Sequence, residues 1–135
     1  MVVVFTTYSC SNAEYNDYDT ERESIVGFAE ALAIAIVPVE DNSIDIEIEF
    51  ITSDVASTDR TYQVYVVSEG TNIDAENFSF NPSVVMPANQ YYATFTFTAI
   101  DVSLPTSFGD VFLAFETNGD ILTSREINLK VKKDD

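Results

Sequence analysis

Apolar and polar residues alternate along most of the chain beyond residue 24, and a period of two predicts β-strands. The clearest case is SIDIEIEF at residues 43–50, where three isoleucines and a phenylalanine alternate with three acidic residues. Such a strand is half-buried, with an apolar face on the core and an acidic face in water. The alternation recurs in ALAIAIVPV, TYQVYVV, YYATFTFTA, DVFLAFET and REINLKVK, with FSF and SVVM as shorter runs.

Two of these segments also predict which side chains share a face. In ALAIAIVPV the larger aliphatic residues Leu32, Ile34 and Ile36 fall on one face. In YYATFTFTA, Tyr92 shares its face with the threonines at 94, 96 and 98. The alanines of residues 28–37 would also suit a helix, but the β-branched residues there and the following Pro38 favour a strand.

Turn-forming residues separate the alternating segments, and Asn118-Gly119 between two of them is a strong hairpin signal. Seven or eight short strands at regular spacing, without a convincing helix, predict an antiparallel β-sandwich. A chain of 135 residues has room for one such domain. We place the sandwich at residues 25–133, an acidic flexible linker at 11–24 and a leader at 1–10.

Charge and composition exclude several functions. The net charge of −17 repels nucleic acid, whose binding depends on neutralisation of phosphates by Lys and Arg. The chain has no histidine, so it lacks the commonest general base and the commonest transition-metal ligand. Its one cysteine, Cys10, cannot form an intrachain disulfide. We therefore expect no catalytic residues and a protein that is not an enzyme.

The order of several short motifs resembles the Calx-beta-like, immunoglobulin-like domains of Bacteroidota cell-surface lipoproteins. These motifs are IVGF at 25–28, DRTYQV at 59–64, AENFSF at 75–80, VVMPANQ at 84–90 and YATFTFTAIDV at 92–102. The resemblance covers residues 25–131 and implies an immunoglobulin-like β-sandwich of seven strands, which agrees with the seven or eight strands that the alternation predicts.

The beginning of the chain resembles a bacterial lipoprotein signal. An apolar run at residues 2–5 leads to the small Ser9 and then to Cys10, which the resemblance makes the site of lipid attachment. Thr7 and Tyr8 depart from the usual pattern, and no basic residues precede the run, so we expect translation to start upstream of Met1. The acidic residues after Cys10 resemble the export tag of surface lipoproteins. We expect a lipid-anchored protein that faces outward from the outer membrane.

Calcium is a cofactor that the resemblance raises, because Calx-beta domains bind it through carboxylates on loops at one end. Glu40, Asp41 and Asp101 lie between predicted strands, and Asp110 is close in the pattern. The chain does not reproduce the acidic cluster of those domains, so we assign no metal ligands. Calcium stabilisation of a soluble sandwich stays open as one alternative.

Exposed tyrosines are the best candidates for ligand contact. Sugar binding needs aromatic platforms beside hydrogen-bonding side chains, and Tyr65, Tyr91 and Tyr92 suit that role. Neighbouring strand residues face opposite ways, so one of Tyr91 and Tyr92 should point outward. Ordinary cross-strand Tyr–Thr pairing would explain the same residues.

The interpretation that the sequence favours is a non-enzymatic surface module. We expect it to act as a structural or protein-binding part of an outer-membrane assembly, in contact with other surface proteins. The alternative is a stand-alone lipoprotein that binds carbohydrate or acts in adhesion.

Overall fold

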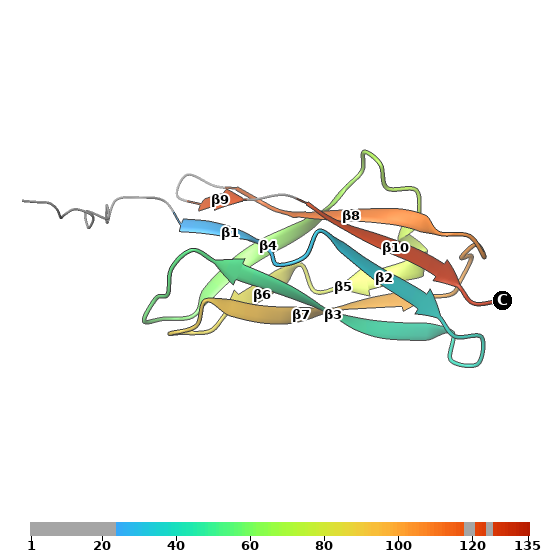
Figure 1. Ribbon diagram of the computed structural model, residues 1–135, viewed down its shortest axis with the longest axis horizontal. Coiled ribbons are helices and arrows are strands. Elements are labelled where there is room, and N and C mark those ends of the chain that lie inside the picture. Colours follow the sequence, from blue (N-terminus) through green and yellow to red (C-terminus); the bar gives the residue numbers. More distant parts are fainter. Residues whose placement is uncertain (1–23, 118–120, 124–125) are drawn as a thin grey trace, which may run out of the picture.

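The computed structural model describes residues 24–117, 121–123 and 126–135 (Figure 1). The expected leader with Cys10, nearly all of the expected linker and the Asn118-Gly119 turn lie outside these residues. Ten strands and one short 3-10 helix, η2 (Ala75–Asn77), form the described part. The strands are β1 (Ser24–Phe28), β2 (Leu32–Val37), β3 (Ser43–Thr52), β4 (Arg60–Val67), β5 (Phe78–Phe80), β6 (Ser83–Met86), β7 (Tyr92–Ile100), β8 (Gly109–Phe115), β9 (Ile121–Thr123) and β10 (Ile127–Lys133).

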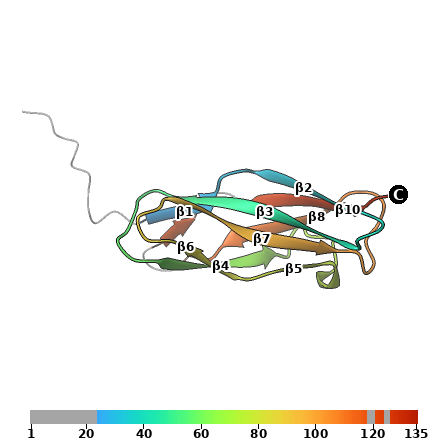
Figure 2. The same ribbon diagram turned by 90° about the horizontal axis from the view of Figure 1, so that it is seen from below.

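The strands form two five-stranded sheets, which confirms the predicted β-sandwich (Figures 1 and 2). The first sheet has the order β5-β7-β3-β1-β9, and the second has the order β2-β10-β8-β4-β6. Most neighbours are antiparallel, but β1 pairs with β9 and β2 pairs with β10 in parallel. The sheets are therefore mixed, where the sequence predicted antiparallel strands only.

The strand count exceeds the predicted seven to eight because the first apolar segment is divided. β1 pairs with β3 in the first sheet, whereas β2 pairs with β10 in the second. The chain changes sheets between these strands, at residues 29–31. The short strand β9 is a further addition. Residues 28–37 form no helix, as predicted, since β1 ends at Phe28 and β2 occupies Leu32–Val37.

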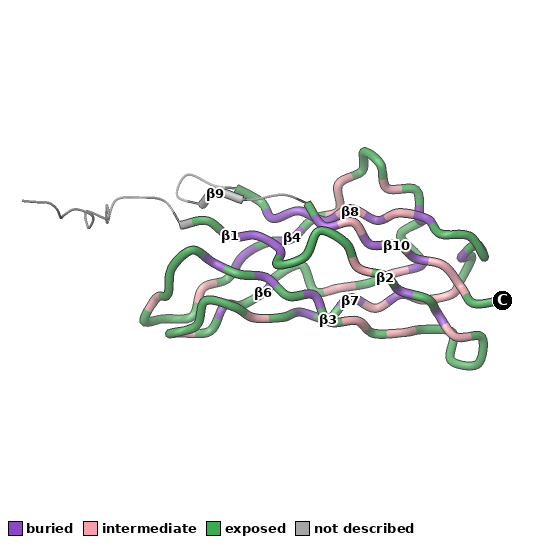
Figure 3. Tube along the Cα trace, viewed as in Figure 1, coloured by how far each residue is buried: buried purple, intermediate pink, exposed green. Residues whose placement is uncertain are grey.

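A cluster of aromatic rings fills part of the core between the sheets. The ring of Phe115 on β8 lies 4.7 Å from that of Phe28, 5.5 Å from that of Phe50 and 6.3 Å from that of Tyr62, measured between centroids. All four side chains are buried. Buried segments alternate with exposed ones along the strands, as Figure 3 shows. This is the pattern that the period of two predicted.

The aliphatic row of β2 (Leu32, Ile34 and Ile36) does share one face, as predicted, but that face is turned to solvent. The three side chains are 50%, 55% and 37% exposed. Ala35 and Val37 are fully buried instead. The register explains this, because Ala35 lies beside the buried Val131, whereas Ile34 and Ile36 lie beside Lys130 and Lys132 on the outer face.

Candidate ligand-binding surface

Tyr91 and Tyr92 stand together at one end of the first sheet, where β7 begins. Their side chains are 62% and 51% exposed, and their ring centroids are 6.5 Å apart with 54° between the planes. We expected one of the two tyrosines to point outward, and both are in fact exposed. We call this pair the tyrosine platform. Two adjacent, tilted and solvent-facing rings present a broad apolar surface with a hydroxyl on each ring.

Two residues of the DRTYQV motif position the turn that leads into the platform. The Asp59 carboxylate accepts a hydrogen bond of 2.8 Å from the Ala88 N–H. The Arg60 guanidinium forms an ion pair of 2.9 Å with Asp54 and donates to the carbonyl oxygen of Gln90 at 3.4 Å. The platform thus follows a turn that is tied to the end of β3 and the start of β4.

An apolar hollow lies beside the platform on the outer face of the first sheet. Ile51 on β3 pairs with Tyr92 on one side and with Gly27 of β1 on the other. Because Gly27 has no side chain, a space of about 150 Å³ remains between its neighbours. Its lining residues are Ile25, Gly27, Ile51, Thr52 and Ser53. We call this space the glycine hollow.

A row of polar side chains continues from Tyr92 along the same face. Thr96 Oγ1 donates to Glu47 Oε2 at 2.8 Å, and Thr98 Oγ1 donates to Asp45 Oδ1 at 2.7 Å. Thr94 is paired with Glu49 in the same register. Hydroxyls and carboxylates therefore line the surface next to the platform. This combination of apolar rings and hydrogen-bonding groups is what sugar recognition requires.

Tyr65 does not belong to this site. It lies on β4 in the second sheet, where it pairs with Ala114 and is 44% exposed. The three tyrosines proposed from the sequence are thus divided between the two sheets, and only Tyr91 and Tyr92 come together. Tyr65 is an exposed tyrosine of the same protein that can serve as a matched control.

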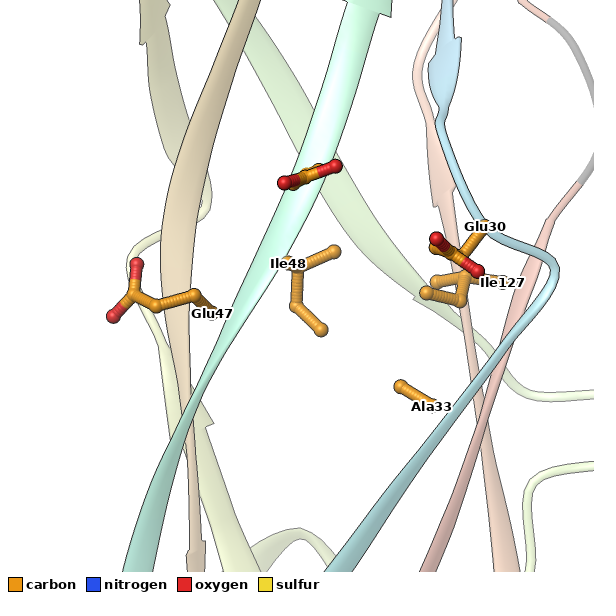
Figure 4. Close-up of a pocket in the computed structure, with 6 residues that line it drawn as sticks. Glu30, Ala33, Glu47, Ile48 and Ile127 are labelled. Carbon is orange, nitrogen blue, oxygen red and sulfur yellow. The ribbon is translucent and has the colours of Figure 1, made fainter.

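A second hollow, of about 250 Å³, opens between the two sheets near the change from β1 to β2 (Figure 4). Figure 4 shows Glu30 beside Ile127, whereas the side chain of Glu47 points away from the space. Glu47 is also engaged by Thr96. The sequence did not predict this hollow, because no local pattern shows where the chain passes from one sheet to the other. Its carboxylates do not converge.

The acids considered for calcium do not form a cluster. Among the described residues, no group of three or more acidic side chains is placed to hold a metal ion. Asp110 forms an ion pair of 2.8 Å with Lys130, and this hydrogen bond lowers the pKa of the Asp110 carboxyl against a smaller opposing effect of burial. The Asp101 carboxylate accepts from the Leu104 N–H at 3.3 Å. Calcium stabilisation stays a prediction.

The described part of the chain also contains no helix that is long and apolar enough to cross a membrane.

No family model matches the chain, and no curated protein matches its sequence. Solved structures do match. A protein of unknown function from Bacteroides ovatus has a TM-score of 0.65 at 12% identity, over 80% of this chain and 44% of that one. The apo form of the Calx CBD1 domain has a TM-score of 0.63 at 12% identity, over 84% of this chain and 100% of that one.

A third match is a proposed carbohydrate-binding protein from Bacteroides ovatus. Its TM-score is 0.63 at 11% identity, over 81% of this chain and 37% of that one. The chain therefore spans less than half the length of either Bacteroides protein. At such identities the matches show the fold alone, which is a Calx-beta-like β-sandwich.

Proposed function

We propose that this β-sandwich is a non-catalytic binding module that recognises carbohydrate on the outer face of its first sheet. The observation that carries the proposal is the tyrosine platform, where Tyr91 and Tyr92 are both more than half exposed. The C–H face of a sugar ring stacks on such rings, and the neighbouring hydroxyls and carboxylates hydrogen-bond its hydroxyl groups. The proposed carbohydrate-binding protein among the structural matches supports this choice of ligand.

The proposal that the module is non-catalytic rests on the chemistry of its side chains. A histidine-dependent nucleophile is impossible in a chain without histidine. The carboxylates of Asp45 and Glu47 are held on an open sheet face by threonine hydroxyls. A carboxylate pair that hydrolyses glycosides instead flanks the scissile bond in a site where one pKa is raised.

Affinity electrophoresis in native gels tests the proposal. The protein is run through gels that contain neutral polysaccharides, and a bound ligand retards it. We expect retardation of the wild type by at least one polysaccharide and its loss in the Tyr91→Ala/Tyr92→Ala double variant. Tyr65→Ala is the matched control and should migrate like the wild type. Equal loss in the control, or retention in the double variant, contradicts a binding site at the platform.

The anchor and its location are part of the same proposal. We propose that a lipid on Cys10 holds the module at the outward face of a bacterial outer membrane. Two or more acyl chains are enough for stable membrane attachment. Intact mass of the protein made from its full reading frame, with and without Cys10→Ala, measures this directly. A mature chain that begins at an acylated Cys10 supports the anchor, and an unmodified chain contradicts it.

A second candidate function is a structural or protein-binding module of an outer-membrane assembly. The aliphatic row of β2 favours it, because Leu32, Ile34 and Ile36 form an exposed apolar line on the edge strand of the second sheet. Edge strands with apolar faces tend to be covered by another chain. Ile34→Lys should release the module from such an assembly and leave polysaccharide retardation unchanged. The double tyrosine variant should do the opposite.

A further inference from the structure

We infer that the glycine hollow is a subsite for the acetamido group of an N-acetylhexosamine. This inference rests on the proposed function, since it names the kind of sugar that the same surface selects. The hollow is lined by the aliphatic side chains of Ile25 and Ile51 and lies over Gly27. A space of about 150 Å³ with such walls has room for a small apolar group such as the methyl of an acetamido group.

The Ser53 hydroxyl at the rim of the hollow supplies the polar partner. Ser53 Oγ accepts a hydrogen bond of 3.0 Å from the Ile25 N–H, and the Ser53 N–H donates to the Ile25 carbonyl oxygen at 2.9 Å. Both contacts fix the oxygen in place. The Ser53 O–H proton makes no hydrogen bond to a described residue and is free to donate, since a hydroxyl is both donor and acceptor. An acetamido group offers a methyl for the hollow and a carbonyl oxygen for this proton.

The hollow and the platform are close enough for one oligosaccharide to contact both. Tyr92, Ile51 and Gly27 are directly opposite one another on β7, β3 and β1. Neighbouring strands are about 5 Å apart, so Gly27 is about 10 Å from Tyr92 across the sheet, which is close to the length of a disaccharide. A sugar that stacks on Tyr92 can therefore place the acetamido group of the next sugar over Gly27.

Charge restricts the ligand further. Glu49 lies on the same outer face, two residues before Ile51 on β3, and the chain carries a net charge of −17. Uronic acids and sulfated sugars are repelled by such a surface. A free amino sugar would be attracted by charge alone. The experiment must therefore distinguish binding through the acetyl group from binding through the positive charge of a deacetylated sugar.

Three tetrasaccharides with the same β-1,4 linkage make this separation. Isothermal titration calorimetry compares chitotetraose, which carries acetamido groups, with cellotetraose, which carries hydroxyls, and with the deacetylated glucosamine tetramer, at low salt and at 0.5 M NaCl. We expect chitotetraose to bind at least about tenfold more tightly than cellotetraose, the range that a well-fitted small apolar group gives. Binding of the deacetylated tetramer should be weak at high salt.

Two variants test whether the selectivity for acetylated sugars arises at the hollow. Gly27→Val fills the space, and Ser53→Ala removes the hydroxyl but leaves the hollow open. Each should reduce the ratio of chitotetraose to cellotetraose affinity. Urea unfolding of each variant verifies that it folds, and Ser53→Ala keeps the test valid if Gly27→Val does not.

The outcomes distinguish a failure of the acetamido subsite from a failure of the proposed carbohydrate binding. Equal affinity for chitotetraose and cellotetraose overturns the acetamido subsite and leaves carbohydrate binding intact. Selectivity that persists in Ser53→Ala and in folded Gly27→Val shows that the acetyl group is recognised elsewhere and overturns the assignment. Failure of all three tetrasaccharides and of the polysaccharides in the gel overturns the inference together with the proposed function.

Discussion

Tyr92 on β7 lies directly opposite Ile51 on β3, and both side chains are exposed on the outer face of the first sheet. If this pair served only the fold, its removal would destabilise the protein. We expect instead that Tyr92→Ala lowers the free energy of unfolding by less than about 1 kcal/mol, the usual range of one exposed cross-strand pair. Urea unfolding measures the change. A loss of more than about 2 kcal/mol would identify Tyr92 as a structural residue.

Phe115 should behave in the opposite way. Its ring contacts those of Phe28, Phe50 and Tyr62 in the core, and it is only 3% exposed. We expect Phe115→Ala to cost about 3–5 kcal/mol, as for other large-to-small changes in a packed core. The same urea measurement applies, with Tyr65→Ala as an exposed aromatic control. A cost below about 1 kcal/mol would mean that the two sheets are not held together at this cluster.

The ion pair of Asp110 and Lys130 predicts a dependence on pH. The hydrogen bond from Lys130 lowers the pKa of Asp110 in the folded protein below its unfolded value of about 3.9. The pair therefore stabilises the fold above the unfolded pKa, and this contribution is lost as the pH falls through the folded pKa. Asp110→Asn should be less stable than the wild type near neutral pH, and the difference should shrink toward about pH 2.

Urea midpoints of the two proteins across this range measure the effect. Asp74→Asn is the control, because the Asp74 side chain does not cap η2 and no described residue pairs with it. A difference between Asp110→Asn and the wild type that stays constant from neutral pH to acid would contradict the role of the ion pair.

The acidic face of β3 predicts a dependence on salt. Asp45, Glu47 and Glu49 repeat every second residue on the outer face of a chain with a net charge of −17. Salt shortens the Debye length from about 10 Å at 0.1 M to about 3 Å at 1 M, so it weakens their mutual repulsion. We expect the melting temperature to rise with NaCl, and to rise less in Glu49→Gln. A melting temperature that falls with salt would show that attractive ion pairs dominate instead.

The alternation of apolar and polar residues predicted the sandwich correctly, because apolar positions face the core and polar positions face outward in the structure. Ile48 and Phe50 are buried while Glu47 and Glu49 face outward, as the period of two requires. What the pattern could not decide is which of two apolar faces turns inward. On β2, Ala35 and Val37 are buried in place of Leu32, Ile34 and Ile36, and the parallel register with β10 sets Ala35 beside the buried Val131.

The candidate ligand-binding surface was only half predictable, for a physical reason. Tyr91 and Tyr92 are adjacent in sequence, so their proximity could be foreseen, but the separation of Tyr65 depends on the sheet to which each strand belongs. The glycine hollow depends on the pairing of Gly27 with Ile51, and its position beside the platform depends on the pairing of Ile51 with Tyr92, both over long sequence distances. No local pattern contains this information. The lipid attachment expected at Cys10 lies outside the described residues and stays a prediction.

The most direct test of carbohydrate binding at the platform is an NMR titration of protein with isotope-labelled tyrosine rings. The ring signals of Tyr62, Tyr65, Tyr91 and Tyr92 are followed while neutral oligosaccharides, chitotetraose and cellotetraose among them, are added. We expect the signals of Tyr91 and Tyr92 to shift in a saturable way and those of Tyr62 and Tyr65 to stay unchanged. Unchanged signals with every sugar, or shifts confined to Tyr65, would contradict it.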